Sequence, residues 1–129
     1  MGKWEILIID VLDIESAVTL ECWAKYTSPQ NGYAQLMAKG YDGAYQIHSN
    51  VSASAGLPRF RLRLWNGSSY AMSGSALATT RCDDNEWHHI VGTYSEGGGA
   101  DNVNIYIDGD LETTSTSTGI INSNTEPFH

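Results

Sequence analysis

Three arginines and one tryptophan occupy every second position of a short stretch of the chain: Arg59, Arg61, Arg63 and Trp65. The positions between them are apolar: Phe60, Leu62 and Leu64. Because successive side chains of a β-strand point to opposite faces, this alternation predicts a strand with one apolar face and one guanidinium face. Guanidinium groups donate hydrogen bonds to hydroxyl and acidic groups, and an indole can stack on the face of a sugar ring. With Tyr45 as a second stacking ring, these residues predict a carbohydrate-binding face.

A structural interpretation of the same arginines stays open. On a solvated sheet face, arginines pair across strands with carboxylates, and Glu21 is one acidic candidate for such pairing. The two interpretations differ in whether the guanidinium groups are occupied by the protein itself or are available to a ligand.

Two further sets of residues could bind a metal, and both favour a structural interpretation. His88 and His89 are adjacent, and adjacent residues of a strand face opposite ways, so their rings cannot chelate one ion together. Cys22 and Cys82 lack the neighbouring His or Cys pairs of a zinc site. The cysteines are either buried free thiols or partners in a disulfide, because sequence spacing cannot establish disulfide geometry.

Strands and turns account for the rest of the pattern. The expected strands cover residues 4–9, 18–25, 35–38, 44–48, 59–65, 70–72, 87–94, 102–108 and 111–117. Residues 73–80 are ambiguous, and a short strand around residues 76–78 stays open. Asp-Gly or Asn-Gly pairs at positions 42–43, 66–67 and 108–109 predict tight hairpin turns. No stretch of ten or more residues has a helical period. The sequence therefore predicts an all-β protein, a two-sheet antiparallel β-sandwich or jelly roll.

The length of the chain, its net charge and its longest apolar run limit the possible partners. A chain of 129 residues has room for one domain with a real core. Its net charge of −8 argues against nucleic acid, which is bound by lysines and arginines that neutralise phosphates. The longest apolar run, residues 6–9, is too short to span a membrane. Residues 1–5 show no signal peptide, which fits an intracellular product or an excised or mature segment.

Three stretches, in this order, carry a family resemblance: VTLECWAK at 18–25, WHHIVGTY at 87–94 and IYIDG at 105–109. They resemble the "FTIEFWVK", "WHHVVGTYD" and "LYVDG" motifs of laminin-G-like domains in the concanavalin-A-like lectin/glucanase superfamily. The resemblance runs from near Trp4 to Asn124 and implies a jelly roll of two curved antiparallel sheets. It also implies a module that is usually secreted or cell-surface, usually non-catalytic, and often binds glycans or proteins.

The end of the chain departs from this family pattern. Family members continue past the position of residues 127–129 with further strands, so we interpret 1–129 as a single domain that is short at its C-terminus. A sandwich that lacks its last strands would expose an unpaired edge, which proteins cover by pairing with another chain or by altered topology. We therefore expect a homo-oligomer or an unusual edge arrangement.

The resemblance also suggests a calcium site. Residues 37–45 are similar to the segment in which pentraxins, relatives of this fold, place a calcium-binding Asp-Asn pair, which makes Asp42 the metal candidate. Gly43 stands where that family has Asn, so a simple Asp-Gly turn is the alternative. Asp101 and Asp108 are further candidates for a rim site.

A relationship to β-glucanases is the weakest interpretation. Residues 11–15 resemble the E-x-D-x-E strand of laminarinase-type enzymes, but Val11 stands where the nucleophile is expected. Retaining glycosidases need two carboxylates about 5 Å apart. We expect a non-catalytic, extracellular or cell-surface recognition module with a carbohydrate ligand. The alternative is a structural or protein-interaction module that assembles through its open sheet edge.

Overall fold

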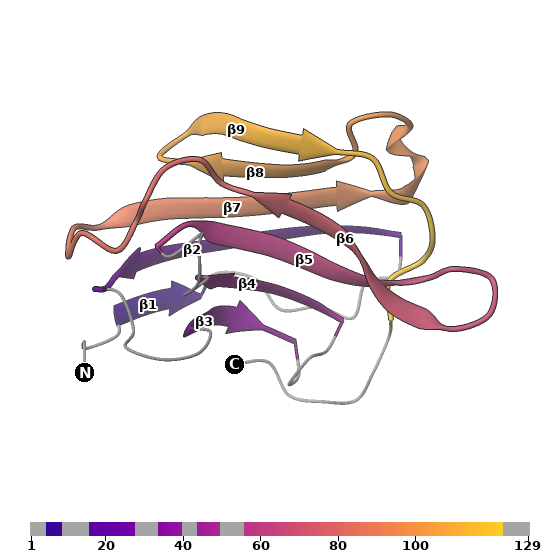
Figure 1. Ribbon diagram of the computed structural model, residues 1–129, viewed down its shortest axis with the longest axis horizontal. Coiled ribbons are helices and arrows are strands. Elements are labelled where there is room, and N and C mark those ends of the chain that lie inside the picture. The colour runs from indigo at the N-terminus through magenta and orange to yellow at the C-terminus, as the bar shows by residue number, and fades with distance from the viewer. Residues whose placement is uncertain (1–4, 9–15, 28–33, 40–43, 50–55, 123–129) are drawn as a thin grey trace.

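The computed structural model describes residues 5–8, 16–27, 34–39, 44–49 and 56–122 (Figure 1). Its strands are β1 (Glu5–Ile8), β2 (Ala17–Lys25), β3 (Ala34–Ala38), β4 (Tyr45–Ser49), β5 (Pro58–Trp65), β6 (Tyr70–Leu77), β7 (His88–Ser95), β8 (Val103–Ile107) and β9 (Asp110–Ser115). A 3-10 turn, η1 (Glu96–Gly98), follows β7. No α-helix occurs in the described ranges, so the prediction of an all-β chain is confirmed.

The strands form two antiparallel sheets. One sheet has five strands in the order β1-β2-β7-β8-β9, and the other has four in the order β3-β4-β5-β6. Figure 1 shows the four-stranded sheet in front, with β5 and β6 crossing the strands of the five-stranded sheet behind it. This arrangement is the two-sheet β-sandwich that the sequence predicts.

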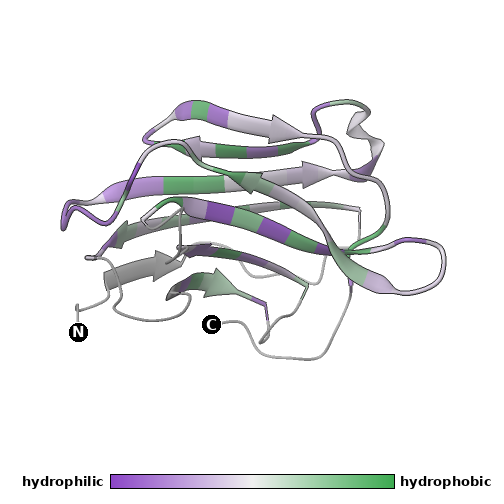
Figure 2. Ribbon diagram, in the orientation of Figure 1, coloured by the Kyte–Doolittle hydropathy of each residue, from purple (hydrophilic) through white to green (hydrophobic). Residues whose placement is uncertain are grey.

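Alternating side chains produce the two faces of each sheet. Along β5 every second residue is buried, and Figure 2 shows the matching alternation of hydrophobic and hydrophilic bands. The same alternation of buried and half-buried residues runs along β7 and β8. The Asp108–Gly109 turn joins β8 to β9 with positive φ angles of 52° and 89°, as its sequence predicts.

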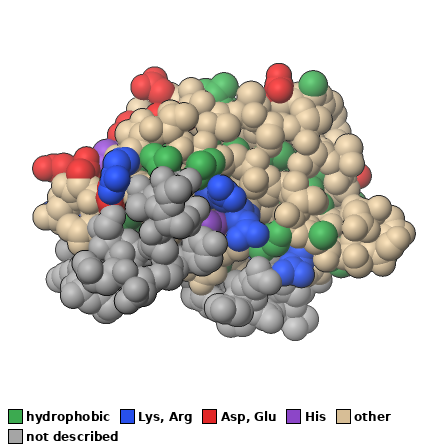
Figure 3. Space-filling view, viewed as in Figure 1, with side chains coloured by type: hydrophobic (Ala, Val, Ile, Leu, Met, Phe, Trp, Pro, Cys, Tyr) green, Lys and Arg blue, Asp and Glu red, His purple; other side chains and the backbone are tan. Residues whose placement is uncertain are grey.

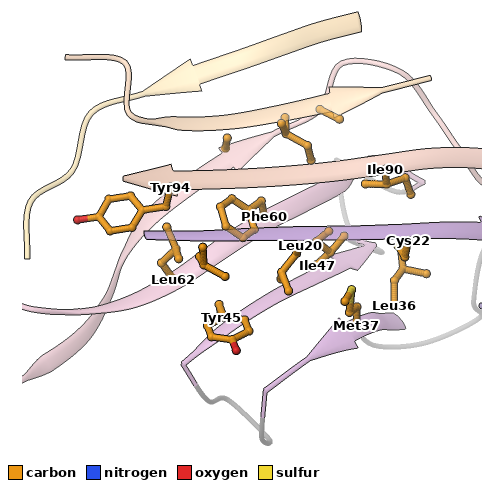
Figure 4. Close-up of a cluster of buried hydrophobic side chains, with 14 of the residues drawn as sticks. Leu20, Cys22, Leu36, Met37, Tyr45, Ile47, Phe60, Leu62, Ile90 and Tyr94 are labelled. Carbon is orange, nitrogen blue, oxygen red and sulfur yellow. The ribbon is translucent and has the colours of Figure 1, made fainter. Parts of the chain in front are cut away.

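The core lies between the inner faces of the two sheets (Figure 4). Phe60 of β5 is fully buried and packs against the backbone of Gly92 in β7. A Cβ atom at position 92 would lie 2.4 Å from the Phe60 ring, so only glycine leaves room for the aromatic side chain there. This contact joins the two sheets at the centre of the sandwich.

Side-chain hydroxyls join the edges of the two sheets on the side of β6 and β9. Thr113 and Ser115 of β9, and Ser117 beyond it, donate hydrogen bonds to backbone carbonyls of β6. The acceptors are the carbonyl oxygens of Leu77, Ser75 and Ser73, at 2.6, 2.7 and 3.3 Å respectively. We call this row of contacts the hydroxyl seam. It occupies carbonyls that an edge strand otherwise offers to another chain.

The segment after β9 returns to the four-stranded sheet. Ile121 is fully buried and forms an antiparallel bridge with Leu64 near the end of β5. The backbone N–H of Trp65 donates to the carbonyl of Ile120, and the N–H of Asn122 donates to the carbonyl of Arg63, both at 2.9 Å. Residues 120–122 thus pair with residues 63–65 of β5, beyond the part of β5 that pairs with β4.

Both cysteines are free and fully buried, which selects one of the two alternatives left open by the sequence. Burial, together with the charge of Glu21, raises the pKa of the Cys22 thiol to about 12. Burial, followed by the nearby carboxylates, raises the pKa of Cys82 to about 12 as well. Neither thiol is therefore ionised at neutral pH.

Candidate functional site

The predicted arginine row lies on the outer face of β5. Its members alternate with buried core residues: Arg59, Arg61 and Arg63 are half-buried, and Trp65 is exposed. The pairing of β5 with β6 contains a bulge. The extra residue is Ser73 of β6, which has no partner in β5, so the alternation along β5 is unbroken. Basic side chains lie over β5 in Figure 3. We call these four residues the arginine face.

Neutral hydrogen-bonding groups of β4 lie beside the arginines. The register places His48 opposite Arg59 and Gln46 opposite Arg61, and Nε2 of Gln35 donates to Oε1 of Gln46 at 2.9 Å. Burial, followed by the charges of Arg61 and Arg59, lowers the pKa of His48 to about 4. The imidazole is therefore neutral at pH 7, and the positive charge of this face comes from the guanidinium groups.

Arg59 and Arg61 have no ion-pair partner among the described residues. Within the same residues, Nε of Arg59 is buried and has no hydrogen-bond partner. Arg81 differs, because its Nη2 lies 2.6 Å from Oδ2 of Asp83. The predicted alternative of pairing with Glu21 is wrong, because Glu21 lies in the other sheet, where Oε1 is 2.5 Å from Nε2 of His89.

Trp65 ends the arginine face next to the β5–β6 hairpin. Its indole meets the ring of Tyr70 edge-on, with centroids 5.1 Å apart and planes at 60°. The Asn66–Gly67 turn closes the hairpin, and Oδ1 of Asn66 accepts hydrogen bonds from the backbone N–H groups of Ser68 and Ser69. The indole is 39% exposed, which leaves part of its surface for a ligand.

Tyr45 does not belong to the arginine face. The register places it opposite Leu62, a core residue, and its side chain is only 1% exposed. Figure 4 shows its ring among the buried side chains. The predicted stacking of Tyr45 on a sugar is therefore wrong. Its position two residues before the buried Ile47 was the available signal, because residues i and i+2 of a strand share a face.

The predicted calcium candidates do not come together in the described residues. Asp42 lies outside them. Asp101 precedes β8 and Asp108 follows it, so these two carboxylates lie at opposite ends of one strand and cannot share a rim site. The described residues contain no group of three or more His, Cys, Asp or Glu side chains that could hold a metal ion.

His88 and His89 face opposite ways, as predicted. The ring of His88 is buried and lies between two carboxylates, 2.8 Å from Asp108 and 2.9 Å from Asp84. Burial lowers the pKa of His88, but the hydrogen bonds to the two carboxylates outweigh it and raise the pKa overall. His89 points to the outer face of the five-stranded sheet, where it contacts Glu21 and Trp23.

The sequence did not indicate a second group of polar and aromatic side chains, on the outer face of the five-stranded sheet. Trp23 of β2 stacks on His89 of β7 with ring centroids 4.8 Å apart. Further along β2 and β7, Thr19 and Thr93 line a hollow of about 540 Å³ together with Asn104 of β8. The alternation within each strand showed that these residues face outward. It did not show which residues of β2 and β7 lie opposite one another, and the pairing of the two strands decides that.

Two antiparallel sheets around one core, with polar and aromatic side chains on their outer faces, define a β-sandwich domain. The chain belongs to the laminin-G-like family, because the family model Laminin_G_3, described as the concanavalin A-like lectin/glucanases superfamily, matches residues 7–129. Membership supports a lectin-like or protein-interaction module in general, and domains of this family are commonly extracellular. The comparisons with curated proteins and with solved structures found no match. Among the described residues, no helix is long and apolar enough to cross a membrane.

Proposed function

We propose that this protein is a non-catalytic, extracellular recognition module that binds an acidic carbohydrate on the arginine face. The observation that carries the proposal is the row of guanidinium groups along β5, in which Arg59 and Arg61 have no ion-pair partner among the described residues. Charged side chains that the protein leaves without a counter-charge are available to an anionic ligand.

The distribution of charge supports an anionic ligand. The chain carries 15 acidic residues and only 7 lysines and arginines, yet three of its four arginines lie on one strand. A local positive row on an acidic protein attracts anions to this face and not to the rest of the surface. Acidic glycans fit this requirement without conflicting with the net charge.

The geometry supports a chain of sugars and not a single small anion. Alternate residues of a strand are about 6.6 Å apart, so the three guanidinium groups extend over about 13 Å. The guanidinium groups of Arg59 and Arg61 can each donate two parallel hydrogen bonds to a carboxylate or sulfate group. Trp65 adds a partly exposed indole at one end of the row, where a sugar ring can stack.

A glycan array that contains acidic and neutral glycans, run with calcium and again with a chelator, tests the proposal. We expect acidic glycans to bind in both conditions, and the bound signal to fall at least about tenfold in Arg61→Ala and in Trp65→Ala. The matched control is Arg81→Ala, which removes the same charge from an exposed arginine outside β5 that is paired with Asp83.

Three outcomes contradict the arginine face as the site. Binding that survives Arg61→Ala excludes it, and binding that falls equally in Arg81→Ala reduces it to a net-charge effect. Binding lost on chelation points instead to Asp42 and calcium. If the folded protein binds no acidic glycan on the array, the alternative is favoured: a protein-interaction module that assembles through the edges at β1 or β3.

A further inference from the structure

The outer face of the five-stranded sheet carries a continuous strip of side chains that the arginine face does not involve. The register of β2 and β7 places three pairs side by side on this face: Thr19 with Thr93, Glu21 with Val91, and Trp23 with His89. The register of β7 and β8 adds Asn104 beside Thr93 and Tyr106 beside Val91. The strip runs from a polar end at Thr19 to an aromatic end at Trp23.

The aromatic end holds an exposed indole in a fixed orientation. Trp23 is 41% exposed, and its ring stacks on His89 with planes at 28°. Nε2 of His89 lies 2.5 Å from Oε1 of Glu21, which fixes the imidazole in turn. An indole held in this way loses little conformational entropy when a sugar ring packs on it. The half-buried carboxylate of Glu21 lies next to the rings and can accept hydrogen bonds from sugar hydroxyls.

The polar end is a hollow with hydrogen-bonding walls. Its volume of about 540 Å³ lies within the range of about 300–1,000 Å³ found for small-molecule sites. Thr19, Thr93 and Asn104 contribute hydroxyl and amide groups from the three strands, and Asp101 contributes a carboxylate from the β7–β8 connection. Nδ2 of Asn104 lies 3.4 Å from Oγ1 of Thr93 and 3.2 Å from the carbonyl of Asp101, so the amide is positioned before any ligand arrives.

The length and the charge of the strip limit the kinds of ligand that it can bind. Thr19 and Trp23 are four positions apart on β2, which is about 13 Å at 3.3 Å per residue, the length of a short oligosaccharide. Glu21 and Asp101 place a carboxylate near each end, and the strip from Thr19 to Trp23 contains neither arginine nor lysine; Lys25 of β2 lies two positions beyond Trp23. Carboxylates repel an acidic glycan and accept hydrogen bonds from neutral hydroxyls.

We propose that the outer face of the five-stranded sheet, from the Thr19–Asn104 hollow to Trp23, is a second carbohydrate-binding site, specific for a neutral oligosaccharide. One sugar occupies the hollow and hydrogen-bonds to its hydroxyl and amide groups. Another stacks on Trp23 with its hydroxyls toward Glu21. The site is independent of the arginine face, because the two lie on the outer faces of different sheets.

The test uses the neutral glycans of a printed array, followed by titration calorimetry with the neutral oligosaccharide that binds most strongly. We expect Trp23→Ala and Asn104→Ala each to weaken binding by about tenfold or more, because one removes the stacking surface and the other removes the amide of the hollow. Trp23→Phe should retain part of the affinity. The control is Leu111→Ala, which truncates an exposed apolar side chain of β9 in the same sheet.

Several outcomes overturn this second site. Binding that survives both Trp23→Ala and Asn104→Ala places the ligand elsewhere. Equal loss in Leu111→Ala shows a general loss of structure, which thermal unfolding of each variant detects independently. An array on which only acidic glycans bind overturns the second site and leaves the arginine face standing. If only neutral glycans bind, and Trp23→Ala abolishes this binding, the result supports the second site and contradicts the proposed function.

Discussion

Nδ1 of His88 lies 2.8 Å from Oδ2 of Asp108, across the start of β7 and the turn that follows β8. The other ring nitrogen lies 2.9 Å from Oδ1 of Asp84, and the backbone N–H of His89 donates to Oδ1 of Asp108. A protonated imidazole can donate to both carboxylates at once. The protonation of one histidine therefore connects the β8–β9 turn to the segment before β7.

The first prediction concerns the upper side of the pH–stability profile. The pKa of His88 is raised in the folded protein, because its two carboxylate contacts outweigh burial. The stabilisation that protonated His88 gives the folded protein is therefore complete below the unfolded pKa of about 6.5. It is lost as the pH rises through the folded pKa. We expect the free energy of unfolding in urea to fall as the pH rises above about 6.5. His88→Gln should remove that decrease, and an unchanged slope in the variant would contradict the assignment.

The second prediction concerns the lower side of the same profile. Burial, followed by the charges of Arg61 and Arg59, lowers the pKa of His48 to about 4. Below about pH 6.5 the unfolded chain takes up a proton that the folded chain does not, so stability falls as the pH falls toward 4. The loss is on the order of 3 kcal/mol over this range. Urea unfolding of His48→Gln at pH 6.5 and 4.5 should show a smaller difference than the unchanged protein does.

The third prediction concerns the contact between the sheets at Gly92. Gly92→Ala places a methyl group 2.4 Å from the buried Phe60 ring, and overpacking of this kind costs about 1–3 kcal/mol. Chemical denaturation should show this loss, and the added change Phe60→Leu should recover part of it. Gly97→Ala is the matched control, because nothing lies within 4 Å of the added atom there. Equal effects of the two glycine substitutions would show that backbone freedom, and not the space for Phe60, is responsible.

The fourth prediction concerns the hydroxyl seam. Thr113→Val and Ser115→Ala each remove one hydrogen bond to a carbonyl of β6, and a hydrogen bond contributes about 1 kcal/mol. We expect each variant to lose about that much unfolding free energy in urea. Thr114→Val lies between them on β9, at an exposed position whose side chain is not part of the seam, and should change little. A loss as large in this variant would assign the effect to strand propensity.

The fifth prediction concerns the two thiols. Cys22 and Cys82 are fully buried, and burial raises the pKa of each to about 12. Since the thiolate is the reactive species, neither cysteine should react with an aromatic disulfide reagent at pH 8 in the folded protein. Both should react once the protein is unfolded in guanidinium without reductant. Fewer than two reactive thiols in the unfolded sample would indicate a disulfide.

The sequence predicts most of the fold because alternation determines which side chains are buried. The pattern of Phe60, Leu62 and Leu64 between arginines is sufficient to place the arginine face on the outside of β5. The same rule, applied from Ile47, would have placed Tyr45 in the core. Residues 73–80 are ambiguous in the sequence, with a short strand around residues 76–78 as one interpretation, because the stretch contains Gly74 and small polar residues of low strand propensity. In the structure β6 continues through this stretch to Leu77.

Register accounts for what the sequence could not show. Trp23 and His89 are 66 positions apart, and only the pairing of β2 with β7 brings their rings together. The hydroxyl seam depends on contacts between strands of different sheets, which no periodicity within one strand encodes. Sites built within one strand could therefore be predicted, and sites built across strands could not.

The hydroxyl seam gives the sandwich a closed side. Along β6 and β9 the two layers are connected by side-chain hydrogen bonds, and β1 and β3 form the opposite edges of the two sheets. Local separation of the two layers should therefore begin at β1 and β3, the edges farthest from the hydroxyl seam. Amide protons of β6 and β9 should then exchange with solvent only when the whole domain unfolds, whereas those of β1 and β3 should exchange earlier. Attachment of another protein domain is expected to be tolerated best on the open side.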